Sequence, residues 1–485
     1  MTKTLVEQLA DFTDRTEFGR LPEAVVDESK RLLLDSFGCA VGGVSHPKGR
    51  IGIEYGLVSG GSGGPATIVG TSRRSSVSGA AFANGELMNA LDFDAVLPPG
   101  HVAPYVFPAL LAVGEALGST GKSVIAATAL SHEMSYRFGK AMDYIRDATT
   151  GEISTSPVIG YTATIFGAAA AISKVQGVDR PVIANALGIA AAITPVNSHR
   201  SWMAHSPSAT IKYTMAGPMA QAALTAAYSA QLGHRGDLQV LDDRKFGYPT
   251  FIGTTRWEPD VIAELDAKDT EWRFLGESSF KPYPHCRILH APLDALIHLL
   301  AENDIKPEEI DAIRVWGEAW VMLPVWLNND IAAVHDGQFS IAHGIAVGAH
   351  RITPGPAWQD PGVVFSPSVM ELMKKVTYSP HPNYAAELGK HPSARPSLIE
   401  VDARGTTFNA ERRFPKGSPS PEQDTYMTTE QIVEKFRVNV AGVLTSSAAD
   451  EVIDAVLNLE RLDDIGVVTR LLAAEPSMQS VGVAR

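Results

Sequence analysis

The stretch LPEAVVDESKRLLLDSFGCAVGG, residues 21–43, indicates how this chain folds. Its apolar residues recur at helical spacing, Pro22 suits the first turn of a helix, and Gly42-Gly43 is typical of a helix end. Similar apolar faces follow in several later stretches before residue 268, namely 104–120, 122–142, 168–172 and 184–193. We therefore expect a large helical domain whose central, Ala-rich helices pack closely.

The pattern changes near residue 270. IDAIRVWGEAW (310–320) alternates apolar and polar residues like a strand, and SLIEVDARGTTFNAERRF (397–414) predicts a hairpin. After Pro415 the chain returns to helical patterns at 428–440 and 448–462. The predicted fold class is mainly α. Residues 1–268 and 417–485, from both chain ends, form one all-helical domain, and residues 269–416 form a smaller inserted α/β domain.

Composition and charge exclude several classes of protein. The 485 residues are 45% hydrophobic and 20% charged, which is typical of a globular protein and not of a disordered or fibrous one. The net charge is −13 and the sequence has no run of Lys or Arg, so neither nucleic acid nor an anionic membrane is an expected partner. Only two cysteines occur, and the N-terminus has no apolar signal segment, which favours a cytoplasmic location.

Common cofactor and metal motifs are missing from the sequence. It contains no GxGxxG after a strand, no GxxxxGK[ST], no HExxH and no GxSxG. We therefore expect no cofactor and no metal.

The first candidate cluster is LDFDAVLPPGHVAP, residues 91–104. Asp92 and Asp94 end a predicted helix, and His101 follows in a loop rich in Pro and Gly. A carboxylate beside an imidazole can orient it for proton transfer. A capped loop with a hydrogen-bonded histidine explains the same residues equally simply.

The second cluster surrounds Lys212, in the stretch HRSWMAHSPSATIKYTMAGPMAQAAL (199–224). No acidic residue lies within twenty positions on either side. A lysine in such a small-residue helix either binds an anion or extends its ammonium group to the surface, and the sequence leaves both open.

The third cluster is SSFKPYPHCRILHAPLDAL, residues 278–296. Four basic side chains, which suit a carboxylate or phosphate ligand, stand here beside the start of a helix: Lys281, His285, Arg287 and His290. Cys286 fits a small buried residue better than a nucleophile.

These clusters together resemble the MmgE/PrpD family of 2-methylcitrate dehydratases, cis-aconitate decarboxylases and iminodisuccinate epimerases. Further resembling segments, in family order over nearly the whole chain, are LLLDSFGCAVGG, QFSIAHGIAVGA and VEKFRVNV. The resemblance implies that the α/β domain is a lid over the helical domain, with the active site between them. It also implies a homodimer that needs no cofactor and acts on small polycarboxylates by proton transfer next to a carboxylate.

The resemblance also assigns site residues. The active-site Asp of the family falls on Asp92, its loop His on His101, and its two lysines on Lys212 and Lys281. The Arg and His of its lid motif fall on Arg287 and His290, while His285 departs from the small residue or Cys often found there.

One departure concerns the reaction. Many members carry a His just before the Ala-rich helix, whereas this chain reads TSPVIGYTATIFGAAAA (155–171) without one. The nearest polar substitutes are Thr155, Ser156, Tyr161 and Thr162. A phenol is a poorer proton shuttle than an imidazole near neutral pH. We therefore rank decarboxylation below dehydration.

The favoured hypothesis is a lyase of the dehydratase type acting on a small di- or tricarboxylate. Lys212, Lys281 and Arg287 would bind carboxylates and stabilise the charge of the carbanion. His101, oriented by Asp92, would move the proton, and Tyr161 or His290 would protonate the leaving group. The alternative is an epimerase or isomerase that uses the same carbanion, with a decarboxylase and a non-catalytic binding protein ranked below both.

Overall fold

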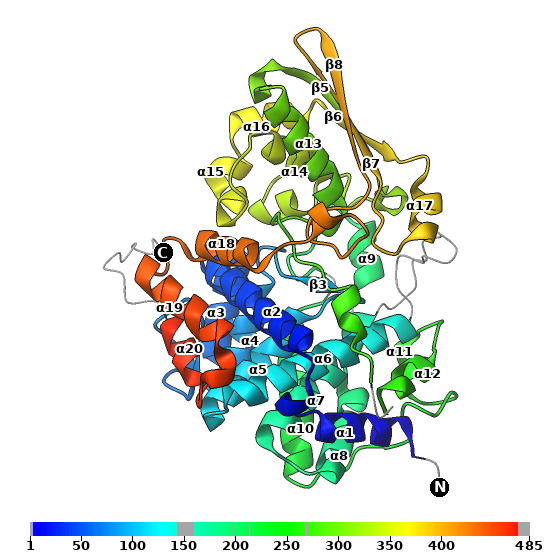
Figure 1. The fold of residues 1–485 in the computed structure, drawn as a ribbon, viewed down its shortest axis with the longest axis vertical. Helices are drawn as coiled ribbons and strands as arrows, with labels where there is room; N and C mark the ends of the chain where they lie inside the picture. The colour runs from blue at the N-terminus through cyan, green and yellow to red at the C-terminus, as the bar shows by residue number, and fades with distance from the viewer. Residues whose placement is uncertain (1–2, 143–159, 197, 213, 267–269, 474–485) are drawn as a thin grey trace.

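Helices make up most of the chain, together with one small mixed sheet, as the sequence predicts. The computed structural model describes residues 3–142, 160–196, 198–212, 214–266 and 270–473. Figure 1 shows the first half of the chain as a helical part at the bottom and the sheet with its helices at the top.

The helical part includes α2 (Glu23–Gly42), whose apolar residues at helical spacing predicted a helix there. Its other long helices from the first half of the chain are α1 (Leu5–Arg15), α3 (Pro47–Gly60), α4 (Val77–Met88), α5 (Ala103–Leu117), α6 (Gly121–Ala141), α7 (Thr164–Gln176), α8 (Arg180–Ile193) and α10 (Ala216–Gln231). The alanines at 168–171 of α7 are fully buried. The α3–α4 crossing is so close that a Cβ on Gly56 would lie 2.5 Å from the Gly79 carbonyl oxygen. Small side chains therefore set the helix spacing.

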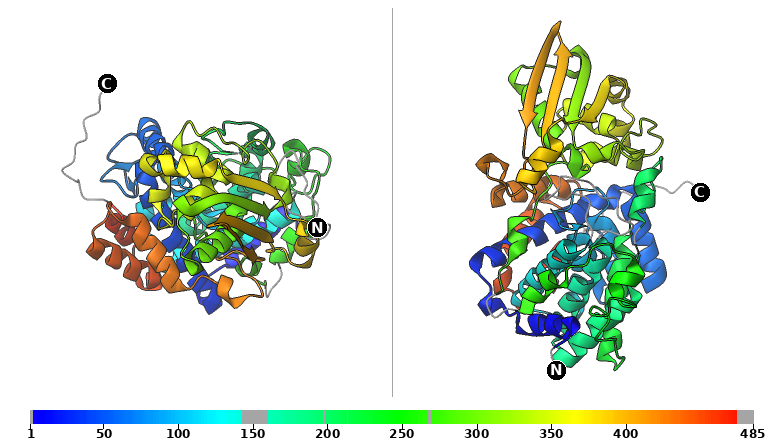
Figure 2. Two further views of the ribbon diagram at one scale, coloured as in Figure 1. Left: turned by 90° about the horizontal axis from the view of Figure 1, so that it is seen from above. Right: turned by 90° about the vertical axis from the view of Figure 1, so that its right-hand side faces the viewer.

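The sheet of the upper part has the strand order β6-β5-β7-β8. Strands β5 (Ile310–Gly317) and β6 (Val376–Pro380) are parallel, whereas β7 (Ser397–Ala403) pairs antiparallel with β5 and with β8 (Thr406–Arg412). The turn of the predicted β7–β8 hairpin has positive φ at Arg404 and Gly405, which suits a tight two-residue connection. Helices α13 (His290–Glu302) and α14 (Ile341–Ala349) pack against the sheet (Figure 2).

The chain ends in the helical part. Helix α18 (Thr429–Val440) and α19 (Ser446–Leu457) both pack against α2, and α19 also contacts α20 (Gly466–Leu471). Figure 1 shows these helices beside the blue N-terminal helices rather than beside the sheet. The domain boundaries themselves, at 268/269 and 416/417, stay predictions.

A short hairpin connects the two parts. Strands β3 (Val96–Leu97) and β4 (Gly100–His101) follow α4, and Val96 exchanges two backbone hydrogen bonds with Ser279, of 2.8 and 2.9 Å. The loop that carries Asp92 and His101 is thereby held beside the segment that carries Lys281.

Candidate active site

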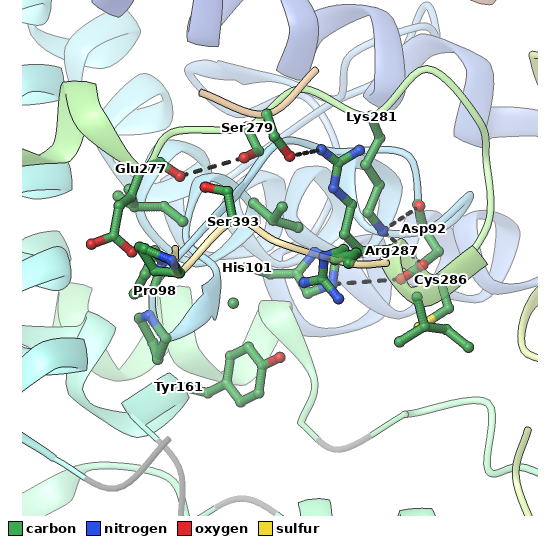
Figure 3. Close-up of a pocket in the computed structure, with 18 of the residues that line it drawn as sticks. Asp92, Pro98, His101, Tyr161, Glu277, Ser279, Lys281, Cys286, Arg287 and Ser393 are labelled. Atoms are coloured by element: carbon green, nitrogen blue, oxygen red, sulfur yellow. Dashed lines mark hydrogen bonds and ion pairs between the residues drawn. The ribbon is translucent and has the colours of Figure 1, made fainter. Parts of the chain in front are cut away.

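A cavity of about 210 Å³ lies where the β3–β4 hairpin meets the segment before α13 (Figure 3). Its size suits a small molecule. Both parts of the chain line it, and the lining includes Asp92, His101, Lys140, Tyr161, Glu277, Lys281, Cys286, Arg287 and Arg395. Figure 3 shows Lys281 and Asp92 meeting at one side, with Glu277 at the opposite side.

Asp92 joins the two predicted lysines. It lies in the turn after α4 with a φ of +51° and is 1% exposed. Its Oδ1 accepts a hydrogen bond of 2.9 Å from Lys212 Nζ, and its Oδ2 accepts one of 2.8 Å from Lys281 Nζ. Burial alone would raise the pKa of Asp92, but the charges of Lys212 and Lys281 outweigh burial and hold this pKa well below its usual value. Asp92 is therefore an anion at neutral pH.

Lys212 lies in a turn before α10 and not in a helix, so that expectation was wrong. It has a φ of +54°, is fully buried, and also donates to the Asn89 carbonyl oxygen at 3.0 Å. Burial lowers its pKa to about 8, against the opposing attraction of Asp92. Lys212 is not among the described residues that line the cavity. It contacts the site through Asp92 and does not extend to the surface.

His101 is oriented by Asp94 rather than by Asp92, which corrects the sequence interpretation. Its Nδ1 lies 2.6 Å from Asp94 Oδ2, whereas its Nε2 lies 3.6 Å from Asp92 Oδ1. Asp94 is fully buried, and its Oδ1 accepts a hydrogen bond from Asn89 Nδ2 at 3.1 Å. Burial raises the pKa of Asp94, but His101 and the nearby lysines lower it more. A carboxylate acceptor at Nδ1 leaves the lone pair of neutral His101 on Nε2.

Arg287 lines the cavity, but His285 and His290 are not among its described lining residues, contrary to their predicted role. The Arg287 guanidinium donates to His290 Nδ1 at 2.9 Å, to the Lys416 carbonyl oxygen at 2.9 Å and to the Ser418 hydroxyl. His290 Nε2 in turn donates to the His285 carbonyl oxygen at 3.1 Å. His290 therefore acts as a neutral support for Arg287.

Burial explains why neither histidine serves as a cation. It lowers the pKa of His285 to about 4, and that of His290 well below its usual value, with Arg287 adding to the effect. His285 Nε2 contacts the Ser340 carbonyl oxygen at 3.2 Å.

Tyr161 lines the cavity below His101, with the two rings stacked at 6.3 Å between centroids. Thr155 and Ser156 lie outside the described residues, and Thr162 hydrogen-bonds Tyr248 at 3.2 Å. Cys286 also faces the cavity, and burial raises its pKa, which disfavours the thiolate that a nucleophile needs.

The sequence alone assigns no role to several further polar residues at the site, among them Asp94, Lys140, Glu277 and Arg395. Asp94 stands in the quoted LDFD motif, so its signal was present, but the choice between two adjacent carboxylates needs geometry. Lys140 and Glu277 form an ion pair of 2.9 Å at the cavity, and Arg395 pairs with the buried Glu318. Lys140, Glu277 and Arg395 lie far apart in the sequence, and none of them belongs to a recognisable motif.

Two features are absent from the described part of the chain. Its His, Cys, Asp and Glu side chains form no group of three or more placed to hold a metal ion. Among the described helices, none combines the length and apolar character needed to cross a bilayer.

Comparison with known proteins gives a consistent picture. The MmgE/PrpD N-terminal domain matches residues 7–260 and the MmgE/PrpD C-terminal domain matches residues 283–461. The cis-aconitate decarboxylase of Homo sapiens is 26% identical, over 97% of this chain and 95% of that protein. The Mus musculus enzyme of the same name is 26% identical over 99% and 95%, and one from Aspergillus terreus is 24% identical over 93% and 92%. The similarity thus spans both the helical part and the part that carries the sheet.

Proposed function

Because this chain belongs to the MmgE/PrpD family of enzymes, we propose that it is a lyase that acts on a small tricarboxylate without a cofactor. Proton transfer at a carbon next to a carboxylate would be the central step. His101 is the group proposed to move this proton, through Nε2, with Asp94 as its positioning residue.

The observation that carries the proposal is the pairing of a histidine base with cations around one cavity. Lys281 and Arg287 line it together with His101. A polycarboxylate in this cavity would meet Lys281 and Arg287, and these two cations would also stabilise the negative charge that develops on its carbon. Such a concentration of cations opposes the net charge of −13 of the whole chain.

Lys212 has a different part in this proposal. Because it is fully buried and bonded to Asp92, it acts through that carboxylate. Asp92 shared by two lysines holds Lys281 Nζ in one place, so Lys212 is a positioning residue rather than a ligand of the substrate.

Decarboxylation comes first among the reactions to test, although the sequence favoured dehydration. The relatives named above are cis-aconitate decarboxylases, with identities of only 24–26%. Loss of carbon dioxide leaves a carbanion that the cations can stabilise and that His101, once protonated, can quench.

Dehydration and epimerisation are the second candidates, and one sequence feature favours them. The stretch before the Ala-rich helix has no histidine, and among its described residues Tyr161 lines the cavity. Epimerisation needs no acid for a leaving group, so this difference affects it least.

One experiment separates these reactions. The protein is incubated in heavy water with cis-aconitate, hydroxytricarboxylates and chiral dicarboxylates, and products are followed by NMR. Carbon dioxide with a deuterated product indicates decarboxylation, an alkene from a hydroxy acid indicates dehydration, and deuterated substrate of both configurations indicates epimerisation. His101→Gln serves as the control that should abolish each signal. If the wild-type protein changes none of these acids, the proposed function is wrong.

We also propose that the protein is a homodimer. Helix α3 exposes Ile51, Tyr55 and Val58 at 60%, 50% and 82%, and their spacing places them on one face. Sedimentation at micromolar concentration should give twice the chain mass, and a stable particle of 51.8 kDa would contradict the dimer.

A further inference from the structure

Two charged side chains outside the cavity contact the loop that carries Asp92 and Asp94. Asp35 belongs to α2 and Lys435 to α18, and they form an ion pair with 2.6 Å between Oδ1 and Nζ. Asp35 is 1% exposed and Lys435 is 7% exposed. Neither is among the described residues that line the cavity.

Each member of this pair also holds the backbone of the loop. Lys435 Nζ donates to the Phe93 carbonyl oxygen at 2.7 Å and lies 3.9 Å from the centre of the Phe93 ring. Asp35 Oδ2 accepts a hydrogen bond of 3.2 Å from the Ala95 backbone N–H. The pair therefore contacts the residue before Asp94 and the residue after it.

Asp94 lies between these two contacts in the chain. Its carboxylate must stay 2.6 Å from His101 Nδ1 while its backbone is part of a loop without regular structure. Burying an ion pair is a weak source of stability, because desolvation offsets much of the attraction. A contribution to stability therefore does not by itself explain this buried pair, whereas its hydrogen bonds to the loop backbone indicate a role in holding the loop.

We propose that Asp35 and Lys435 are positioning residues that fix the backbone on both sides of Asp94 and so keep His101 in its reactive tautomer. They come from helices near opposite ends of the chain, so the return of α18 to α2 is part of what builds the site. The kinetic side of this inference rests on the proposed function, whereas its structural side does not.

Two variants test the proposal. Asp35→Leu with Lys435→Met removes both hydrogen bonds to the loop without leaving an unpaired buried charge. Lys435→Arg keeps the charge and a donor for the Phe93 carbonyl oxygen. The readouts are the ¹⁵N imidazole shifts of His101 at alkaline pH, identified by their loss in His101→Gln, and kcat and KM on the acid that the wild-type protein converts.

We expect the double variant to show mixed His101 tautomers and a kcat lowered about 10²-fold, as for a displaced reacting group. Its KM should change little, because Lys281 and Arg287 remain. Lys435→Arg should keep the wild-type spectrum and most of kcat. If the double variant does not fold, Asp35→Asn with Lys435→Met removes the Lys435 contact without leaving an unpaired buried charge, and it is expected to show the same changes in smaller measure.

Glu133→Gln controls for lost stability. Glu133 is also a fully buried carboxylate, 2.6 Å from the cation Arg137, and it accepts a backbone N–H, from Phe274 at 2.9 Å. It should lower the unfolding temperature without changing the His101 spectrum or kcat. A wild-type His101 spectrum in the double variant would overturn the proposal, and so would an equal loss of kcat in Glu133→Gln. If the wild-type protein converts no acid, the proposed function fails while the spectra still decide this inference.

Discussion

His101 Nδ1 lies 2.6 Å from Asp94 Oδ2, and both side chains are buried. This contact selects the tautomer in which Nε2 carries the lone pair, so the atom that can take a proton is also fixed in direction. Asp92, the neighbouring carboxylate, is already shared by two lysines. The two aspartates of the LDFD motif therefore have separate roles: Asp94 orients His101, and Asp92 binds the two lysines.

Asp94→Asn should lower kcat by about 10²- to 10⁴-fold, the range for loss of general acid–base catalysis. An amide can present its NH₂ to Nδ1 and so stabilise the wrong tautomer. KM should change little, because Lys281 and Arg287 are untouched. Steady-state kinetics check this, with Glu133→Gln as a buried carboxylate outside the site. An Asp94→Asn enzyme with full kcat would show that this hydrogen bond does not serve catalysis.

Replacing the two lysines by Met should give different kinetics. Lys281 lines the cavity, so Lys281→Met should raise KM and also lower kcat by about 10²- to 10³-fold, as for the loss of one group that stabilises developing charge. Lys212 acts through Asp92, so Lys212→Met should lower kcat with a smaller change in KM. Kinetic constants of both variants on one substrate provide the test. A larger rise of KM in Lys212→Met than in Lys281→Met would show that Lys212 contacts the substrate.

The mainly helical class and the hairpin could be predicted from the sequence because both depend on local patterns. The face of α2 follows the helical period, and β7 alternates buried and half-buried residues. Lys212 was placed in a helix because its neighbours are small and apolar, yet its contacts with Asn89 and Asp92 hold it in a turn. Tertiary hydrogen bonds outweighed local propensity there.

The resemblance named segments that meet in the structure, but it could not show which side chains contact one another. Asp92, His101, Lys281 and Arg287 line one cavity, whereas Lys212 and His290, which the resemblance assigns to the same site, are not among its described lining residues. The sequence could not show that Asp94 rather than Asp92 holds His101, because the two differ by only two positions. Nor could it show that burial makes His285 and His290 neutral, since burial is a property of the whole fold.

Arg287→Lys should raise KM by about 10- to 100-fold, the value of one hydrogen bond to a charged group. The planar guanidinium spans His290, Ser418 and the Lys416 carbonyl oxygen, and an ammonium cannot reproduce that arrangement. His290→Phe should raise KM in the same direction by a smaller factor, because it removes one acceptor that holds Arg287. Substrate titration of the two variants measures this. An unchanged KM in Arg287→Lys would mean that Arg287 does not bind the substrate.

His132 should make the protein sensitive to acid, independently of the active site. It is 1% exposed between Phe107 and Phe274, and its Nδ1 donates to the Thr128 carbonyl oxygen at 3.0 Å. Burial lowers its pKa from 6.5 to about 4. The His132 imidazole is therefore protonated below about pH 6.5 in the unfolded chain but only below about pH 4 in the folded protein. His132 therefore does not reduce the free energy of unfolding above pH 6.5. As the pH falls from 6.5 toward 4, it lowers this free energy by about 3 kcal/mol in total. Urea unfolding of wild type and His132→Gln between pH 7 and 4 tests this, since the variant should lose less free energy of unfolding over that range. Parallel losses in the two proteins would show that His132 takes up no proton on unfolding.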